Sequence, residues 1–232
     1  MAMPMEAGYL IDRLERVHRY KARSFTVIEG ELEGRVLAVI VSGVGLAAAS
    51  RGAERLIDGH RPRVLVSAGF AGALDPSLNR NDLAIPRSVV NAEGETIAID
   101  AEWANAVPAI RRVERLLLVD RVITASSEKG RLRDERQADL IDMETFGVAA
   151  AARDRGIPFI PLRVVSDDAR SELPPEIARM LNASGSYRVG AALRAIWGRP
   201  SAAKDFWTLH AQALEAADRL ANGLQVLLRG LG

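Results

Sequence analysis

The sequence predicts an α/β protein: a single three-layer domain with a central mixed, mostly parallel sheet flanked by helices. One observation is that short apolar runs rich in β-branched residues, such as 36–41 and 159–165, alternate with helical patterns. A second is composition, since 48% of the 232 residues are hydrophobic and 26% charged, enough to bury a large core. We treat residues 1–232 as one domain whose C-terminal part, about 173–232, is helical.

The first half of the chain mixes two helical patterns with strand-like runs. Leu10, Leu14 and Val17 recur at helical spacing among charged residues, whereas residues 36–41 are nearly all apolar, as in a strand buried on both faces. In order, the expected elements are a helix over 10–20, a strand over 24–28, turns at 29–31 and 33–34, a strand over 36–41, a helix over 47–57 and a strand over 64–67. Glycine-rich turns are expected after the last two strands.

The second half continues the alternation and ends in helices. Gly156, with Pro158 beyond it, is expected to end a helix that begins at Glu144. The expected elements are strands over 83–86, 116–124, 141–142 and 159–165, and helices over 144–155, 177–181, 187–197 and 204–228. The last helix is rich in apolar residues, which indicates a core or subunit interface, or alternatively a lid or lipid-facing surface. These residues are Phe206, Trp207, Leu209, Leu214, Leu220, Leu224, Leu227, Leu228 and Leu231.

Composition and charge exclude several classes of protein. With 31 Lys+Arg against 30 Asp+Glu, the chain lacks the positive field of a nucleic-acid binder. The absence of cysteine excludes disulfides, thiolate metal sites and a cysteine nucleophile, and the three histidines show no metal-ligand spacing. No apolar run is long enough to span a bilayer, and residues 1–6 do not resemble a signal peptide. We therefore expect a soluble cytoplasmic protein.

Two glycine-rich segments fall where predicted strands end, the edge at which α/β proteins bind ligands. Residues 43–48 match the G-x-G-x-x-A pattern of dinucleotide sites, but the next strand ends in Ser67-Ala68 without the acidic residue that such sites need. The alternatives are a tight turn, or amides of Gly43 and Gly45 that hold an anion, a hydroxyl or a water. Gly69-Phe70-Ala71-Gly72 indicates either a second tight turn or a close approach of ligand to backbone.

Two further segments carry carboxylates at strand ends. Asp142-Met143-Glu144-Thr145 places Glu144 at a helix start, where the helix dipole favours a carboxylate, so Glu144 is a cap or a site residue. The apolar strand that follows Pro158 ends in Ser166-Asp167-Asp168. Burial and a neighbouring like charge raise the pKa of a carboxyl group, which suits a general acid. The alternative is a solvated turn.

In order and spacing, these segments resemble the nucleoside phosphorylase/nucleosidase superfamily, which includes purine nucleoside phosphorylases, methylthioadenosine/S-adenosylhomocysteine nucleosidases and futalosine hydrolases. The resemblance spans residues 3–169, and 22 residues separate Glu144 from Ser166. Its segments are Met5-Glu6-Ala7, Ser42-Gly43-Val44-Gly45, Gly69-Phe70-Ala71-Gly72, Ile141-Asp142-Met143-Glu144, Gly156-Ile157-Pro158-Phe159 and Leu162 to Asp167. Leu74-Asp75-Pro76, a short loop before Met143 and the Leu173-Pro174-Pro175 stretch are similar to the hopanoid-associated branch, which acts on adenosylhopane, a lipid-linked nucleoside.

The resemblance implies cleavage of the N-glycosidic bond of a purine nucleoside, with adenine favoured and a modified 5′ group, without metal or organic cofactor. It implies that Asp167 protonates the purine near N7 and that Ser166 orients it. Glu144 would bind the ribose hydroxyls, Met143 would pack beneath the sugar and Glu6 would activate water. Further residues expected to bind substrate are Arg163, near Glu6, and Phe70, Ala71, Gly72, Gly43, Gly45 and Ser126. Ser127, Glu128 and Lys129 are either base contacts or solvated loop residues.

Hydrolysis and phosphorolysis are both open, with hydrolysis favoured. By the resemblance, phosphorylases grip phosphate with an arginine and a serine where this chain has Ser67 and Phe70. An aromatic side chain cannot supply charge-assisted hydrogen bonds to phosphate. Phosphorolysis is the alternative, because hopanoid-associated members are often named phosphorylases although they lack that arginine, and phosphate could bind the amides of residues 43–45.

A third possibility is a non-catalytic nucleoside binder. Only residues 1–4 precede Met5-Glu6, where the family has a full strand. Either the true start lies upstream, or the first strand is stunted and Glu6 is poorly held. By analogy with the family's nucleosidases, we expect a homodimer.

Overall fold

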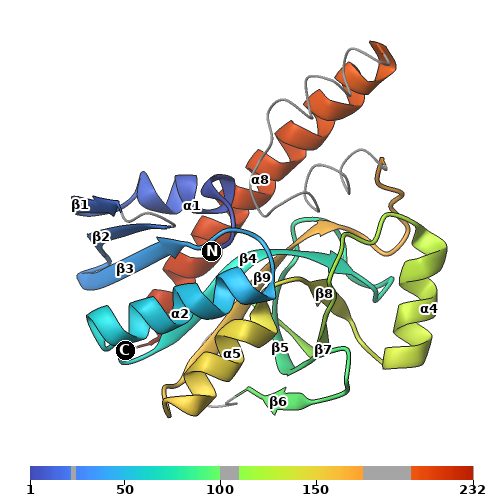
Figure 1. The fold of residues 1–232 in the computed structure, drawn as a ribbon. Coiled ribbons are helices and arrows are strands. Elements are labelled where there is room, and N and C mark those ends of the chain that lie inside the picture. The colour runs from blue at the N-terminus through green and yellow to red at the C-terminus, as the bar shows by residue number, and fades with distance from the viewer. Residues whose placement is uncertain (22–24, 100–109, 175–199, 232) are drawn as a thin grey trace.

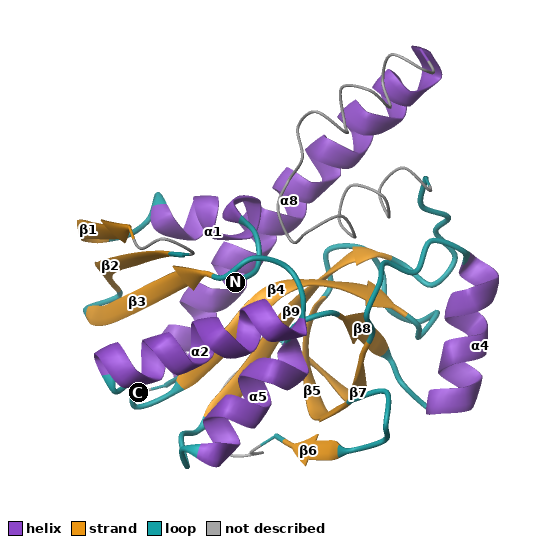
Figure 2. Ribbon diagram, in the orientation of Figure 1, coloured by secondary structure: helices purple, strands orange, loops and turns teal. Residues whose placement is uncertain are grey.

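In the computed structural model, the chain forms two β-sheets with helices on their faces (Figures 1 and 2). The structure describes residues 1–21, 25–99, 110–174 and 200–231. The helices are α1 (Pro4–Ile11), α2 (Leu46–His60), α4 (Ser126–Arg136), α5 (Thr145–Asp154) and α8 (Pro200–Gly230). The strands are β1 (Glu15–Lys21), β2 (Thr26–Leu32), β3 (Arg35–Val41), β4 (Leu65–Ala73), β5 (Leu83–Val90), β6 (Thr96–Ala98), β7 (Arg111–Leu118), β8 (Leu140–Asp142) and β9 (Phe159–Asp167).

The larger sheet has the strand order β6-β5-β7-β8-β4-β9, and β5 also pairs with β9, so five of its strands close into a ring. The pairs β4–β9, β5–β7 and β7–β8 are parallel, whereas β4–β8, β5–β6 and β5–β9 are antiparallel. The smaller sheet, β1-β2-β3, is antiparallel throughout. The fold is thus a mixed α/β fold, with more antiparallel pairing than the alternation of strands and helices indicated.

Apolar side chains pack on both faces of the larger sheet, because alternate residues of a strand point to opposite faces. On one face, α2 and α5 bury Ile57 and Ala152 against the sheet. On the other face, α1 and α8 bury Leu10 and Leu220 against Leu162 of β9. Figure 1 shows α2 and α5 side by side in front of the sheet, with the lower part of α8 behind it. Among the described residues, no helix has the length and apolar character needed to cross a bilayer.

The N-terminal region differs most from expectation. Residues 10–20 do not form one helix: α1 ends at Ile11, and β1 begins at Glu15 and pairs with β2. Residues 29–31, expected as a turn, lie inside β2. Gly30 allows the close approach of Leu14, whose Cβ lies 2.8 Å from where a Cβ on residue 30 would be. The turn expected at Glu33 and Gly34 is confirmed, since both have positive φ values.

Other expected elements hold with changed bounds. The strands at 83–86 and 141–142 and the helices at 47–57 and 144–155 are confirmed by β5, β8, α2 and α5. Residues 68–72 are not a turn but extend β4, and the strand expected over 116–124 is shifted to β7. The strand at 36–41 is confirmed as β3, but not as buried on both faces, since Val36 is 82% exposed. The helices expected over 177–181 and 187–197 lie outside the described residues.

Candidate active site

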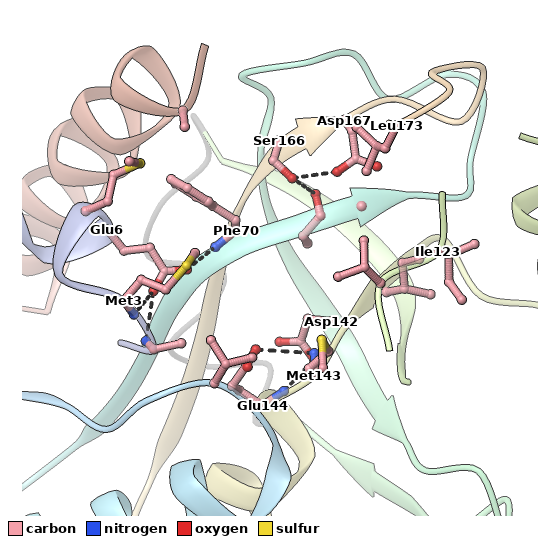
Figure 3. A pocket seen from close by; sticks show the side chains of 18 of the residues that line it. Met3, Glu6, Phe70, Ile123, Asp142, Met143, Glu144, Ser166, Asp167 and Leu173 are labelled. Carbon is pink, nitrogen blue, oxygen red and sulfur yellow. Dashed lines mark hydrogen bonds between the residues drawn. The ribbon is translucent and has the colours of Figure 1, made fainter. Parts of the chain in front are cut away.

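A pocket lies where β4, β8 and β9 end, between the first residues of α1 and the middle of α8 (Figure 3). It brings together eight residues predicted from the sequence: Glu6, Phe70, Ala71, Gly72, Met143, Glu144, Ser166 and Asp167. The other lining residues are Ala2, Met3, Met5, Val44, Val119, Arg121, Val122, Ile123, Ile141, Asp142, Leu173, Leu209, His210, Gln212 and Ala213. Arg163, Gly43, Gly45 and Ser126, also predicted to bind substrate, are not among the lining residues.

Glu6 is held by backbone amides on one side of the pocket (Figure 3). It is the third residue of α1, and its Oε2 accepts hydrogen bonds from the amides of Ala2 (2.8 Å) and Met3 (2.9 Å), so it caps its own helix. Its Oε1 accepts a hydrogen bond from the amide of Phe70 at 3.0 Å, and the side chain is only 3% exposed. The expectation of a poorly held Glu6 is therefore wrong.

Gly69 explains how Glu6 reaches the sheet. A Cβ at this position would lie 2.9 Å from Oε1 of Glu6, so only glycine allows the contact. Gly72 has a similar place farther along β4, where a Cβ would lie 3.2 Å from Oδ2 of Asp167. The glycines of this segment thus admit the protein's own carboxylates close to the backbone.

Glu144 lies at the N-cap position of α5, and its carboxyl group is buried. Its Oε1 accepts a hydrogen bond from the amide of Gly45 at 2.7 Å, and its Oε2 from the amide of Met143 at 3.3 Å. Burial, and after it the negative charge of Asp142, raise the pKa of Glu144 to about 7, although the hydrogen bond from Gly45 opposes the rise. Glu144 is therefore poised to change its charge near neutral pH.

The glycine turn before α2 does not offer free amides at its two glycines. The amide of Gly45 is used by Glu144, and the amide of Gly43 donates to the carbonyl oxygen of Ala2 at 3.1 Å. Gly43 and Gly45 have φ values of 92° and 97°, which other residues rarely adopt. The anion held by this turn is thus the carboxylate of Glu144.

Asp167 ends β9 on the opposite side of the pocket from Glu6 (Figure 3). Its Oδ1 accepts a hydrogen bond from the hydroxyl of Ser166 at 2.7 Å, as the predicted orienting role of Ser166 requires. Its Oδ2 lies 2.6 Å from Nζ of Lys129. Although burial opposes the change, hydrogen bonds from Ser171 and Arg170 lower the pKa of the neighbouring Asp168.

Arg163 is a buried support of the sheet, with 2% of its surface exposed. Its Nε donates to Oδ2 of Asp142 at 2.9 Å, and its Nη1 donates to the carbonyl oxygens of Ser67 and Leu162, each at 2.8 Å. Its Nη2 donates to the hydroxyl oxygens of Ser67 (2.6 Å) and Thr145. All five N–H groups of the guanidinium are used, so Arg163 has no donor left for a nucleoside or a phosphate.

The sequence did not predict the positions of Lys129 and α8 at the pocket. The sequence is compatible with Lys129 as a base contact or a solvated loop residue, whereas the structure buries it fully against Asp167. Ser126, by contrast, is not a lining residue of the pocket, and its hydroxyl donates a hydrogen bond to Glu172 at 2.7 Å. Leu209 and Ala213 of α8 line the pocket, although they lie 40 or more residues beyond the last matching motif. For α8, the sequence predicted only that the apolar residues within 204–228 pack against something.

The chemistry of the pocket is that of carboxylates and apolar side chains. Within the described residues, no three histidine, aspartate or glutamate side chains come together in a way that could hold a metal ion. The cations among the described lining residues include Arg121, which is ion-paired with Glu128 at the surface. Such an arrangement can accept hydrogen bonds from hydroxyl groups, stabilise a developing positive charge and activate a water.

Comparison with known proteins agrees with this description. The structure is similar to S-adenosylhomocysteine nucleosidase from Streptococcus pyogenes in complex with 5-methylthiotubericidin (TM-score 0.77, 18% identity, covering 100% of this chain and 94% of the other). It is also similar to futalosine hydrolase from Helicobacter pylori (TM-score 0.74, 17% identity, 98% and 94%). A sequence profile described as the phosphorylase superfamily matches residues 1–186, which is most of the chain. With this match, the motifs and the fold agree, and the chain belongs to the phosphorylase superfamily.

Proposed function

We propose that this protein hydrolyses the N-glycosidic bond of a purine nucleoside, with adenine as the base and a modified 5′ group. The observation that carries the proposal is the convergence of Glu6, Glu144 and Asp167 on one pocket. Glycosidic cleavage passes through a transition state resembling an oxocarbenium ion, so it needs negative charge near the sugar and help for the leaving base. Three carboxylates from three separate elements can divide these tasks.

The roles follow from the surroundings of each carboxylate. Ionised Glu144 accepts hydrogen bonds from ribose hydroxyls and stabilises the positive charge on the sugar. Glu6, on the other side of the pocket, accepts a proton from the attacking water. Asp167 passes a proton to the purine near N7 as the base departs, and Met143 packs beneath the sugar. The neighbouring solved structures, named as nucleosidases and a hydrolase, support this proposal.

Hydrolysis is favoured over phosphorolysis because the positions predicted to hold a phosphate offer it no hydrogen-bond donors. Ser67 accepts from Arg163, Phe70 offers an aromatic ring, and the amides of Gly43 and Gly45 are occupied. A phosphate dianion needs several charge-assisted hydrogen bonds. Water needs only a base such as Glu6.

The 5′ group is proposed to be apolar. Met3 and Met5 of the α1 region and Leu209 and Ala213 of α8 form an apolar part of the pocket lining. A lipid-linked 5′ group, as in the hopanoid-associated branch, is our specific proposal for this part. We also propose that the protein is cytoplasmic and, by analogy with the family's nucleosidases, that it is a homodimer.

The test is base release by the purified full chain from methylthioadenosine, adenosine and a lipid-linked adenosine, with and without phosphate. We expect adenine and a free sugar, at equal rates with and without phosphate. Asp167→Asn should retain nucleoside binding by calorimetry and lose turnover by about 10²- to 10⁴-fold. Formation of a sugar 1-phosphate only with phosphate would overturn hydrolysis. Binding without any base release would leave the non-catalytic binder.

A further inference from the structure

Lys129 is the single residue of α4 that is buried, and it is buried completely. Its Nζ donates to Oδ2 of Asp167 at 2.6 Å, to the carbonyl oxygen of Asp168 at 2.7 Å and to that of Ser171 at 3.2 Å. The three N–H groups of the ammonium are therefore used, and one of them is aimed at the carboxylate that faces the pocket. Lys129 itself is not among the pocket-lining residues.

Burying the charged ammonium of Lys129 costs free energy, and packing α4 against the rest of the protein does not require a charged group. Lysine side chains normally extend their ammonium group to water, and burying a charge costs several kcal/mol unless a partner compensates it. An apolar residue at position 129 could dock α4 without that cost. We therefore infer that the ammonium of Lys129 is present because of its interaction with Asp167.

The hydrogen bonds of Asp167 bear on its proposed role as a proton donor. Both of its oxygens accept hydrogen bonds, from Ser166 at 2.7 Å and from Lys129 at 2.6 Å. An adjacent ammonium stabilises the ionised form of a carboxyl group. In this arrangement both oxygens of Asp167 act as hydrogen-bond acceptors, yet a departing purine needs a proton donor.

Resting on the function proposed above, we propose that Lys129 is the source of the proton that Asp167 passes to the leaving base. The Nζ–H bond of Lys129 breaks as an O–H bond forms on Asp167, and this proton then moves to N7 as the C1′–N9 bond breaks. The electron pair of that bond stays on the base, which leaves neutral. Lys129 becomes a neutral amine and regains a proton from solvent after the base has left.

The environment of the pair favours this transfer. Exchange of the proton converts two buried charges into two neutral groups, and a poorly solvated site penalises the charged pair more than the neutral one. The pair is poorly solvated, since the side chains of Lys129 and Asp167 are 0% and 12% exposed. Because Lys129 acts through Asp167 and does not face the substrate, it is a positioning residue and not a catalytic one.

The test compares Lys129→Met and Lys129→Arg with wild type on two substrates. One is the purine nucleoside whose base needs a proton, and the other is a nitrophenyl riboside whose phenolate leaves without one. Arginine keeps the positive charge but does not release its proton. We expect both variants to lose about 10²- to 10⁴-fold in kcat on the purine nucleoside. On the riboside they should stay near wild type.

A pH profile gives a second readout. In Lys129→Met, Asp167 can take its proton only from solvent. The rate of this variant on the purine nucleoside, divided by the wild-type rate at the same pH, should therefore rise as the pH is lowered. The matched control is Arg131→Met, on the same helix with a side chain 62% exposed, which should leave both rates unchanged. Thermal unfolding identifies any variant that fails to fold.

The outcomes separate the two proposals. Equal losses on both substrates without recovery at low pH would make Lys129 a structural residue and overturn the inference alone. Full activity of Lys129→Arg on the purine nucleoside would show that charge suffices, which also overturns it. Failure of the wild-type protein to cleave either substrate would overturn the proposed function, and the inference with it.

Discussion

At the scale of single residues, four carboxylates line one pocket, and three of them, Glu6, Glu144 and Asp167, differ in what surrounds them. Glu6 accepts hydrogen bonds from three backbone amides, and Asp167 is paired with an ammonium and a hydroxyl. Glu144 is buried near a fourth carboxylate, Asp142, and binds a proton at higher pH than an ordinary glutamate. Different environments for like groups allow one site to perform acid and base chemistry at the same pH.

The raised pKa of Glu144 gives a prediction about pH. Between pH 4.5, the ordinary value, and about 7, the unfolded chain loses a proton that the folded chain keeps, so the free energy of unfolding should fall as pH rises. The whole effect is about 3 kcal/mol. Glu144→Gln should remove this decline, measured by urea unfolding at pH 5 and pH 8.

The matched control for this prediction is Glu93→Gln, at an exposed position. It should leave the decline in place. In activity assays, the KM of the wild-type protein should rise as pH falls below 7, because protonated Glu144 binds ribose hydroxyls less well. An unfolding free energy that does not fall between pH 5 and 8 would contradict the raised pKa.

The sequence predicted which carboxylates come together in one pocket, but it did not predict which groups hold them in place. Residue types and spacing led to Glu6, Glu144 and Asp167, which lie together in the pocket. The partner of Asp167 is 38 residues away on a polar helix, and nothing in the local sequence of Lys129 marks it as buried. Arg163 looked like a substrate ligand, because only the tertiary contacts reveal that its donors are all occupied.

At the scale of elements, the predictions succeeded where burial leaves a pattern in the sequence. The apolar runs of β3 and β9 and the ends of α5 were predicted closely. The fully exposed β1 has no alternation of apolar and polar residues, and α4 buries only Lys129, so neither carries a periodic signal. β4 was cut short because glycine usually marks a turn, whereas here it admits side chains of Glu6 and Asp167.

Packing of α2 on α5 provides a prediction for this scale. A Cβ on Gly147 of α5 would lie 2.5 Å from Oγ of Ser50 and 2.9 Å from the carbonyl oxygen of Leu46, both on α2. Gly147→Ala should therefore force the helices apart and destabilise the protein by about 1–3 kcal/mol in urea unfolding. Since α2 begins at Leu46, next to the amide that holds Glu144, we also expect a higher KM.

The control for the helix pair is Gly59→Ala near the end of α2. Nothing lies within 4 Å of a Cβ added there. Alanine has the higher helix propensity, so this variant should gain up to about 1 kcal/mol. A Gly147→Ala protein as stable as wild type would mean that α2 and α5 pack less tightly than described.

At the scale of the whole molecule, the pocket is assembled from the two ends of the chain. Glu6 comes from α1, Leu209 and Ala213 come from α8, and the strand ends between them supply the rest. The family resemblance ends at residue 169 and the matching profile at residue 186, so neither could place α8 over the pocket. Amphipathicity indicates that a helix packs, but only the tertiary structure determines against what.

This dual role of α8 predicts that two leucines on the same helix will act differently. Leu220 is fully buried in the core with α1 and β9, whereas Leu209 is half-buried at the pocket. Leu220→Ala should lower the free energy of unfolding by about 2–5 kcal/mol, because it leaves a cavity. Leu209→Ala should change stability by less than about 1 kcal/mol, because a half-buried side chain loses less contact on truncation.

The choice of substrate distinguishes the core role of Leu220 from the pocket role of Leu209. For a nucleoside with an apolar 5′ group, Leu209→Ala should raise KM by about tenfold, the equivalent of about 1.4 kcal/mol of lost apolar contact, whereas adenosine should be little affected. Leu220→Ala, assayed well below its unfolding temperature, should keep the wild-type ratio of KM for the two substrates. An equal rise in KM for both substrates would mean that Leu209 of α8 lines the pocket without contacting the 5′ group. The proposal of an apolar 5′ group would then be contradicted.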